Sequence, residues 1–195
     1  TEYEHGDTLD FTGGKIEVTY SDGTTQTKQI TSNMVKESNG SSVNMAPTAS
    51  DYVNNEVSKT LVIKYKENNV TGTVNYPIKI KNVVSQIAMS TEPTNTTYNI
   101  GDTTYNLAGG TIKVTRKAGN TETVALTDQG ITLTNLSTLT TNKGTKPVTV
   151  TYEGKTTTFN ITVKNGVKNI NITAPTKTEY EHGDTLDFTG GKIEV

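Results

Sequence analysis

The stretch TEYEHGDTLDFTGGKIEV occupies residues 1–18, and the same letters return without a change at residues 178–195. The offset between the two copies is 178 − 1 = 177 residues. Chance does not produce an identity of this length. We therefore predict that the chain spans one full period of a tandem repeat, together with the opening of the next period.

A weaker repeat lies inside this period. The stretch TTYNIGDTTYNLAGGTIKVT at residues 96–115 matches the opening of the chain with one inserted residue. The later segments correspond as well: TLVIKY (60–65) aligns with PVTVTY (147–152), and NYPIKIKN (75–82) aligns with TFNITVKN (158–165). We therefore expect two related domains at residues 1–82 and 83–165, and a partial domain at 166–195. The first domain is expected to lack the opening strand that residues 166–177 give to the next copy.

The composition limits the class of protein. Hydrophobic residues make up 31% of the chain and charged residues 19%, with no tryptophan and no cysteine. Abundant Thr and Asn suit short strands joined by many turns. A formal net charge of −2 and the absence of basic runs argue against nucleic-acid binding, and no apolar stretch is long enough to insert into a membrane. The lack of cysteine rules out disulfides and favours a bacterial exported protein over a secreted animal domain.

Alternating apolar residues predict the strands. KIEVTY (15–20) places Ile16, Val18 and Tyr20 on one face, and the same period of two continues in LVIKY (61–65) and NYPIKIK (75–81). Pro77 lies inside such a pattern, so its strand is expected at a sheet edge or at a bulge. The short turns SDG (21–23), KAGN (117–120) and EGK (153–155) predict hairpins. The fold class is therefore all-β, as tandem immunoglobulin-like antiparallel β-sandwiches. Strands in segments 31–59 and 127–146 are not predictable from periodicity.

The motif that opens with PTKTEYEHGDTLDFTGGKIEVTYSDGT and closes with VTVTYEGKTTTFNITVKN resembles the bacterial immunoglobulin-like domains of group 3. The second domain departs from the motif at Tyr105-Asn106 and at Lys117-Ala118. The resemblance implies an immunoglobulin-like sandwich, used as a stalk or adhesin repeat of a large bacterial surface protein. The family carries no catalytic residues, so none are transferred to this chain.

Histidine and aspartate are the candidate site residues. His5 and His182 share one repeat position, and with no second histidine nearby we interpret them as surface or inter-domain residues and not as metal ligands. Asp7 and Asp10, with their copies Asp184 and Asp187, could contribute to a calcium site, which needs six to eight oxygen ligands. The D-x-x-D spacing matches no calcium loop, and Asn106 stands nearest the second position in the other domain. Asp7 is therefore predicted to cap a turn after Gly6.

No other chemistry is favoured. A serine or threonine nucleophile would have only the two histidines as imidazole bases, and no G-x-S-x-G turn is present, so we predict that the chain is not an enzyme. Intramolecular Lys–Asn or Thr–Gln crosslinks would need a buried carboxyl neighbour, which sequence does not reveal. The sequons follow from a Thr- and Asn-rich composition; they stand at Asn39, Asn69, Asn95, Asn135, Asn160 and Asn171. Our prediction is therefore no catalytic, cofactor-binding or metal-ligating residue, with calcium as the weaker alternative.

The leading functional hypothesis is a structural stalk or spacer of a bacterial cell-surface adhesin, projecting a distal binding domain. Repetition supports it, because identical units make length adjustable and each unit mainly contacts its neighbours. The linkers KNVV (81–84) and KNGVK (164–168) are short, which predicts a rod and not a flexible chain. Two alternatives stay open: the repeats themselves bind a host glycan or protein, or they self-assemble as a surface filament or S-layer. The expected partners are neighbouring repeats, with head-to-tail association through residues 166–177.

Overall fold

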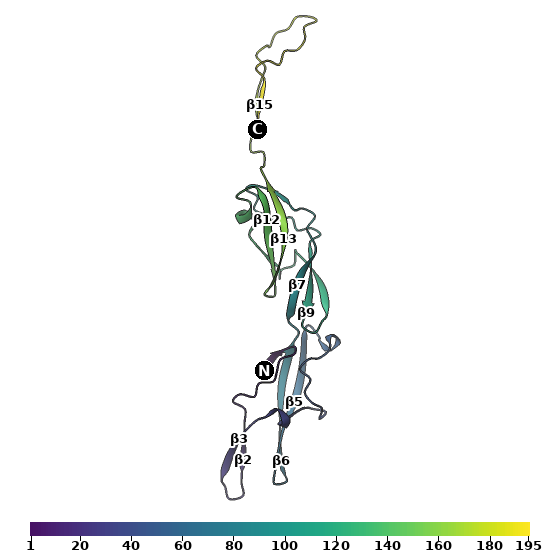
Figure 1. Ribbon diagram of the computed structural model, residues 1–195, viewed down its shortest axis with the longest axis vertical. Coiled ribbons are helices and arrows are strands. Elements are labelled where there is room, and N and C mark those ends of the chain that lie inside the picture. The colour runs from purple at the N-terminus through teal and green to yellow at the C-terminus, as the bar shows by residue number, and fades with distance from the viewer.

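The computed structural model describes residues 1–195 and is an elongated, all-β molecule (Figure 1). We call residues 1–82 the N-terminal region, residues 83–165 the central region and residues 166–195 the C-terminal segment. In Figure 1 these three parts follow one another along the long axis. The helical structure is limited to short turns, and no helix is long and apolar enough to cross a membrane.

The central region is a sandwich of two sheets. One sheet has the order β10-β9-β7, and the other has the order β11-β12-β13-β8. The strands are β7 (Val84–Thr91), β8 (Thr97–Asn99), β9 (Thr111–Arg116), β10 (Thr121–Ala125), β11 (Thr132–Leu133), β12 (Gly144–Tyr152) and β13 (Lys155–Lys164). Helix α1 (Leu136–Leu139) is a single turn that Asn135 caps by accepting the Ser137 N–H. The fold class is therefore all-β, as the alternation predicts.

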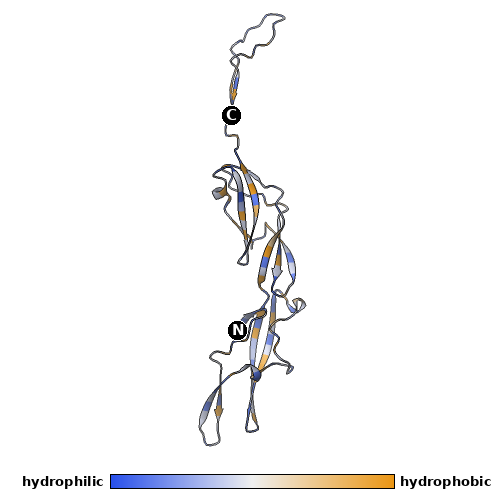
Figure 2. Ribbon diagram, in the orientation of Figure 1, coloured by the Kyte–Doolittle hydropathy of each residue, from blue (hydrophilic) through white to orange (hydrophobic).

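Apolar side chains from both sheets fill the interior of the central region. Figure 2 shows hydrophobic and hydrophilic residues alternating along β9, β12 and β13, as expected for strands with one buried face. Twelve residues form this core. They are Val84, Ile87, Tyr98, Ile112, Val114, Leu126, Leu136, Val148, Val150, Phe159, Ile161 and Val163. The opening strand β7 contributes two of them, so the sandwich depends on its first strand.

The N-terminal region has the same plan with one strand fewer. Its main sheet has the order β1-β6-β5-β4, while β2 and β3 form a separate hairpin. The elements are β1 (Glu2–Glu4), β2 (Lys15–Thr19), β3 (Thr25–Gln29), β4 (Val35–Glu37), β5 (Glu56–Glu67) and β6 (Val70–Lys81), with 3₁₀ turns η1 (Ser32–Met34) and η2 (Ala49–Asp51). Only five residues form its buried core: Val35, Leu61, Ile63, Ile78 and Ile80. No strand stands in the place that β7 takes in the central region.

The C-terminal segment contains one short antiparallel pair, β14 (Asn171–Thr173) with β15 (Lys192–Glu194). Ile172 lies opposite Ile193 in this pair. The same relation holds in the central region, where Met89 lies opposite Ile112. In both places a strand pairs with the strand that follows two consecutive glycines, Gly109-Gly110 in the central region and Gly190-Gly191 here. The side chains of the C-terminal segment are almost all exposed.

Two strand pairs depart from the predicted antiparallel arrangement. Strand β1 pairs in parallel with β6, and β8 pairs in parallel with β13. The cause is the direction of the chain. The central region is entered at the end nearest the N-terminal region and left at the opposite end (Figure 1), so its opening and closing strands run the same way.

Both prolines inside strands lie at unpaired edges, as predicted for Pro77. The N–H of Lys79 donates to the carbonyl of Thr1, just before β1, so the backbone nitrogen two residues earlier, at Pro77, points to the same side of β6. Strand β1 pairs only with Lys79–Lys81, which leaves that side free at Pro77. Pro147 repeats the arrangement on β12, where β11 pairs only with Val150 and Thr151. Neither proline removes a ladder hydrogen bond.

The second glycine of each double-glycine pair is needed for close packing. A Cβ atom on Gly110 would lie 2.7 Å from Leu126 Cδ1 and 3.0 Å from Pro93 Cγ. Leu126 is buried in the core, so it has little room to move. The first glycine, Gly109, has a φ of +78°, a conformation that glycine adopts without a steric penalty.

Replacing Gly110 with alanine is expected to destabilise the central region by about 1–3 kcal/mol, because the added methyl group overpacks the core. The measurement is the melting temperature by circular dichroism. Gly72→Ala is the matched control, since Gly72 also lies outside the positive-φ region and a Cβ there meets no atom within 4 Å. An equal effect of the two substitutions would contradict the packing argument.

Candidate functional site at the junction of the two regions

The link between the N-terminal and central regions is two residues long. Strand β6 ends at Lys81 and β7 begins at Val84, so only Asn82 and Val83 connect the closing strand of one region to the opening strand of the next. Asn82 is 1% exposed although its side chain is polar. A buried amide is stable only when its hydrogen bonds are satisfied, so its partners define the junction.

Asn82 forms hydrogen bonds to both regions. Its backbone N–H donates to the carbonyl of Asn55 in the N-terminal region at 2.8 Å. The side chain turns to the central region: Oδ1 accepts the Ala118 N–H at 2.9 Å, and Nδ2 donates to Asn120 Oδ1 at 2.6 Å. The Asn82 carbonyl accepts from Arg116 Nη1 at 3.2 Å. One buried residue thus forms hydrogen bonds to both regions.

Arg116 is the charged centre of the junction. It continues the inward face of β9 after Ile112 and Val114, and its side chain is 5% exposed. The guanidinium donates to both carboxylate oxygens of Glu153, at 3.0 and 3.1 Å, and its Nε donates to Glu122 Oε1 at 2.9 Å. A two-pronged contact of this kind fixes orientation as well as distance.

The charge of Arg116 is preserved despite its burial. Burial acts to lower the pKa of the guanidinium, but the hydrogen bonds to Glu153 and Glu122 together raise that pKa above its ordinary value. A charged group that is mostly buried and then loses its partners is strongly destabilising. We call Asn82, Arg116, Ala118, Asn120, Glu122 and Glu153 the junction cluster.

A surface ion pair extends the junction. Lys117 Nζ lies 2.7 Å from Glu4 Oε2, which joins the β9–β10 turn to the N-terminal region. The Lys117 N–H also donates to the Val83 carbonyl at 3.0 Å. Because the ion pair is largely exposed, it adds at most about 1 kcal/mol and is screened by salt. The backbone bond and the buried amide are therefore the main constraints.

The turn between β9 and β10 positions these donors. Arg116 N–H donates to the Asn120 carbonyl at 3.0 Å, and Gly119 takes a φ of +89° to close the turn. Lys117 and Ala118 are the residues at which this hairpin departs from the sequence motif, and both contact the link. The departure thus has a structural explanation: the turn is adapted to the junction.

Sequence reasoning did not find Asn82 or Arg116. A signal was present for one of them, because Arg116 is the only arginine in the chain and it occupies an inward strand position that Tyr20 takes in the N-terminal region. A lone cation on an otherwise apolar face indicates a buried partner. Asn82 gave no such signal, since asparagine is abundant and normally marks turns.

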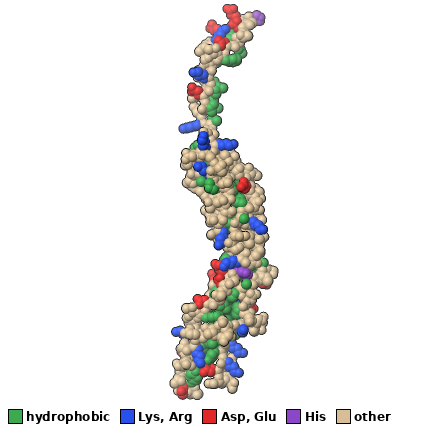
Figure 3. Space-filling view, in the orientation of Figure 1, with side chains coloured by type: hydrophobic (Ala, Val, Ile, Leu, Met, Phe, Trp, Pro, Cys, Tyr) green, Lys and Arg blue, Asp and Glu red, His purple; other side chains and the backbone are tan.

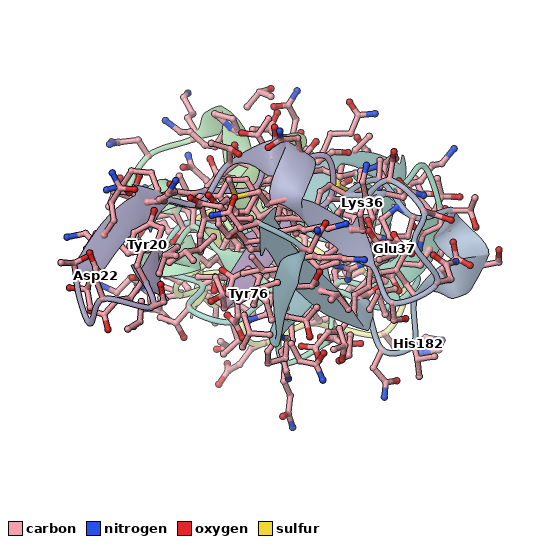
Figure 4. The ribbon with its side chains drawn as sticks, turned by 90° about the horizontal axis from the view of Figure 1, so that it is seen from below. Tyr20, Asp22, Lys36, Glu37, Tyr76 and His182 are labelled. Atoms are coloured by element: carbon pink, nitrogen blue, oxygen red, sulfur yellow. The ribbon has the colours of Figure 1, made fainter.

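The N-terminal region holds a related polar contact in the place of Arg116. Tyr20 Oη donates to Glu67 Oε1 at 3.0 Å, and Lys28 Nζ lies 2.9 Å from Glu67 Oε2. Tyr65 donates to the same carboxylate. The hydrogen bonds from Tyr65, Lys28 and Tyr20 lower the pKa of Glu67 to about 2. This contact attaches the end of the β2–β3 hairpin to β5; Figure 4 shows Tyr20 and Asp22 on that hairpin, with Tyr76 nearer the middle of the molecule.

The predicted turn-capping role of Asp7 is confirmed. Asp7 Oδ2 accepts the Glu4 N–H at 2.7 Å, and the Asp7 N–H donates back to the Glu4 carbonyl at 3.0 Å. Asp102 and Asp184 make the same pair of bonds in the other two copies. A carboxylate that caps a turn in all three copies has a structural role that needs no bound cation.

The second carboxylate of the D-x-x-D pattern also binds the backbone. Asp10 Oδ1 accepts the Thr12 N–H at 2.8 Å, and Asp187 accepts the Thr189 N–H at 2.8 Å. Asn106, which stands in this place in the central region, accepts the Ala108 N–H at 3.2 Å. Because an amide performs the same function, the position requires a hydrogen-bond acceptor and not a negative charge.

The tyrosine of the motif closes the loop that contains these residues. Tyr180 Oη donates to the Asp187 carbonyl at 3.0 Å and accepts the Asp187 N–H at 2.9 Å. Tyr3 makes the same contacts with Asp10, and Tyr98 makes them with Asn106. The motif Tyr-x-x-Gly-Asp is thus the signature of a folded loop and not of a binding site.

The two histidines lie in different parts of the chain. His5 Nδ1 lies 2.9 Å from the Tyr52 hydroxyl in the N-terminal region, and His182 is exposed in the C-terminal segment. The structure brings together no group of three or more His, Cys, Asp or Glu side chains that could hold a metal ion.

Comparison with known proteins gives one family match. Residues 91–163 match the family described as bacterial Ig-like domain (group 3), which covers most of the central region. No curated protein matches the chain. A solved structure, titled "Structure of surface layer protein SbsC, domains 4-9", is 14% identical with a TM-score of 0.27. The match covers 84% of this chain and 28% of that one, so this chain spans less than a third of its length.

Replacing Asn82 with alanine is expected to lower the free energy of unfolding by about 1–3 kcal/mol. The Ala118 N–H and the Asn120 side chain, which are both partly buried, would lose their hydrogen-bond partner. The melting temperature should fall, and small-angle X-ray scattering should show a broader distribution of molecular lengths. Asn165→Ala is the matched control, since Asn165 holds the equivalent position at the end of β13 and is exposed. Equal behaviour of the two variants would contradict the role given to Asn82.

Acid is expected to weaken the contact at Glu67. The folded-state pKa lies below the ordinary value of 4.5, so the stabilisation is fully present above about pH 4.5 and is lost as the pH falls toward 2. Carbon NMR of the Glu67 carboxyl should give a titration midpoint of about 2. In Glu67→Gln the amides of β2 and β3 should exchange faster at neutral pH. A midpoint near 4.5 would show that the carboxylate is not held by Tyr20, Tyr65 and Lys28.

Proposed function

We propose that this chain is a structural spacer: a rod of immunoglobulin-like repeats that holds a distal binding domain away from a bacterial cell surface. The observation that carries the proposal is the junction cluster. A two-residue link whose asparagine is buried and bonded to both regions resists bending, and resistance to bending is what a spacer needs. A freely jointed chain of the same contour length would reach much less far.

The shape of the molecule supports this function. The central region is entered at one end and left at the other, so successive units add length along one axis (Figure 1). The proposed units are residues 1–82 and 83–165, with residues 166–195 opening a third. Two separate hydrophobic cores and sheets that each take strands from one unit only support these boundaries.

The match of residues 91–163 to bacterial Ig-like domains supports a bacterial origin and an extracellular, cell-surface location. The recurring motifs also support a mechanical role over a chemical one. The aspartates and the tyrosine that recur in the motif form hydrogen bonds with backbone groups of their own loop. The buried cation Arg116 forms ion pairs at the junction. We therefore propose that the chain has no enzymatic activity.

Rigidity at the junction can be tested by double electron–electron resonance, because the chain has no cysteine of its own. Spin labels at Ser58→Cys on β5 and Thr123→Cys on β10 occupy exposed positions on either side of the link. A single narrow distance distribution is expected, and it should broaden when Asn82→Ala and Arg116→Ala are added. A broad distribution in the unmodified junction would contradict the rod.

The second candidate function is binding of a host glycan or protein by the repeats themselves. A glycan array and a pull-down with the complete 195-residue chain distinguish the two. The spacer predicts no saturable binding to any surface component. Saturable binding that survives Asn82→Ala would assign the ligand to one unit and replace the spacer as the primary function.

A further inference from the structure

One aromatic side chain fills the space beside β11 in the central region. Tyr105 packs against the core, and its ring meets the Tyr98 ring edge-on, with the ring centroids 5.8 Å apart. The Tyr105 hydroxyl donates to the Thr134 carbonyl at 2.8 Å. Burial raises the pKa of the Tyr105 hydroxyl to about 12, so this hydroxyl stays protonated and remains a donor across the neutral range. A phenol ring is therefore part of the packing of this region.

The N-terminal region has a leucine where the central region has Tyr105. The motif aligns YEHGDTLDF (3–11) with YNIGDTTYNL (98–107), which makes Leu9 the counterpart of Tyr105. A leucine side chain has no ring and no hydroxyl, so it cannot donate to a backbone carbonyl as Tyr105 does. The two regions therefore differ at the position that carries the phenol.

The acceptor of this hydrogen bond has a counterpart as well. Strand β4 pairs with β5 as β11 pairs with β12, and the registers make Val35 equivalent to Leu133. The next residue in the chain, Lys36, therefore holds the place of Thr134, whose carbonyl accepts the phenol in the central region.

A pocket lies between the two positions. It has a volume of about 380 Å³ and is lined by both Leu9 and Lys36, so it corresponds to the space that a tyrosine ring fills in the central region. All of its lining comes from residues 7–45, and it borders the sheet β1-β6-β5-β4 at Val35. Figure 3 shows hydrophobic side chains exposed at several places over the N-terminal region. We call this feature the Leu9 pocket; its apolar lining is Leu9, Phe11, Val35, Val43 and Met45.

The apolar lining suits a flat ring. Val35 forms a buried floor, and Leu9, Val43 and Met45 are half-buried around it. Phe11 adds an aromatic ring, against which a second ring packs favourably edge-on or offset, as Tyr98 and Tyr105 do in the central region. Apolar walls with a few polar groups are typical of small-molecule sites.

The polar lining suits a neutral hydroxyl group. Ser32 and Ser42 contribute hydroxyls that can accept a hydrogen bond. Asp7 Oδ2 already accepts the Glu4 N–H, but a carboxylate accepts further donors. Because the carboxylate of Asp7 and the ammonium group of Lys36 both line the pocket, a neutral ligand meets balanced charges there.

We propose that the Leu9 pocket binds a neutral phenolic ring, of a small phenol or of a tyrosine side chain. The ring takes the place that Tyr105 fills in the central region, and its hydroxyl donates to an acceptor of the pocket lining. None of the lining residues belongs to the junction cluster, so the inference does not rest on the spacer function. A single ring is held weakly and is lost in the washes of a pull-down, so this site is also distinct from the binding function weighed above.

NMR titration of the complete chain tests the proposal with two phenolic probes, N-acetyl-tyrosinamide and 4-methylphenol. A dissociation constant of about 1 mM is expected, because a single ring has few atoms to bury. Saturable shifts are expected at the backbone amides of Leu9, Lys36 and Val43, and none at Asn82. Tighter binding of N-acetyl-tyrosinamide would assign the site to a tyrosine side chain, and tighter binding of 4-methylphenol to a free phenol. No saturable shift at the pocket with either probe would overturn the proposal.

Two comparison ligands separate a phenol site from other small-molecule sites. N-acetyl-phenylalaninamide lacks the hydroxyl and should bind about fivefold more weakly than N-acetyl-tyrosinamide. Glucose has hydroxyl groups but no aromatic ring, and it should cause no saturable shift. Equal binding of the two amino-acid amides, or binding of glucose at the same residues, would contradict a phenol site.

Leu9→Tyr tests the equivalence with Tyr105. The new ring should fill the pocket from within, raise the melting temperature and weaken the binding of both probes by about tenfold or more. Leu186→Tyr is the matched control, because Leu186 is the same motif residue in the C-terminal segment and is 70% exposed. Binding that survives Leu9→Tyr unchanged would show that the probes do not occupy this space.

A second pair of variants covers the case in which Leu9→Tyr does not fold. Val43→Asp places a charge in the apolar wall that the β4–β5 connection provides, so it should also reduce probe binding by about tenfold or more. Ser41→Asp introduces the same charge two residues away, at an exposed position outside the lining, and should leave binding unchanged. Equal probe binding by these two variants would overturn the assignment.

Discussion

The buried side chain of Asn82 is the interaction on which the arrangement of this protein depends. Its backbone directly follows the end of β6, while its side-chain amide is hydrogen-bonded to the turn between β9 and β10. The chain can therefore leave one sandwich and enter the next within two residues and still satisfy the polar groups at the crossing. Arg116 forms ion pairs with Glu122 and Glu153 at the same end of the central region.

A thin interior explains why the opening strand matters so much. Only 23 of the 195 residues are buried, so each hydrophobic core consists of few side chains. The central region buries twelve apolar residues in one cluster, to which β7 contributes Val84 and Ile87, and the N-terminal region buries five.

Much of the fold could be predicted from sequence, because strand alternation and exact repetition are local signals. The inward faces of KIEVTY and PVTVTY, the hairpin turns and the capping role of Asp7 all follow from neighbours within a few residues. The parallel pairing of β1 with β6, and of β8 with β13, could not be predicted, since it depends on how the chain crosses between sheets. Helix α1 also lay in a segment without periodicity, where one turn and an Asn135 cap leave almost no pattern.

The junction was the least predictable part. Asn82 and Ala118 are far apart in sequence, and neither residue type normally indicates a buried contact. Repetition gave an indirect guide, because one of the two places at which the central region departs from the motif, Lys117-Ala118, contacts the link. The other, Tyr105-Asn106, contacts residues of its own region.

The parallel strand pairs have a consequence for a molecule under tension. A pull on the two ends of the central region enters through β7 and leaves through β13, and once it reaches β8 it draws β8 and β13 in opposite directions along their length. Their bonds, from the Thr162 N–H to Thr96 and from the Ile100 N–H to Lys164, are then loaded together and not one after another. Strands β1 and β6 meet the same load in the N-terminal region, through Lys79 and Thr1. Parallel pairing of this kind therefore opposes such a pull in shear.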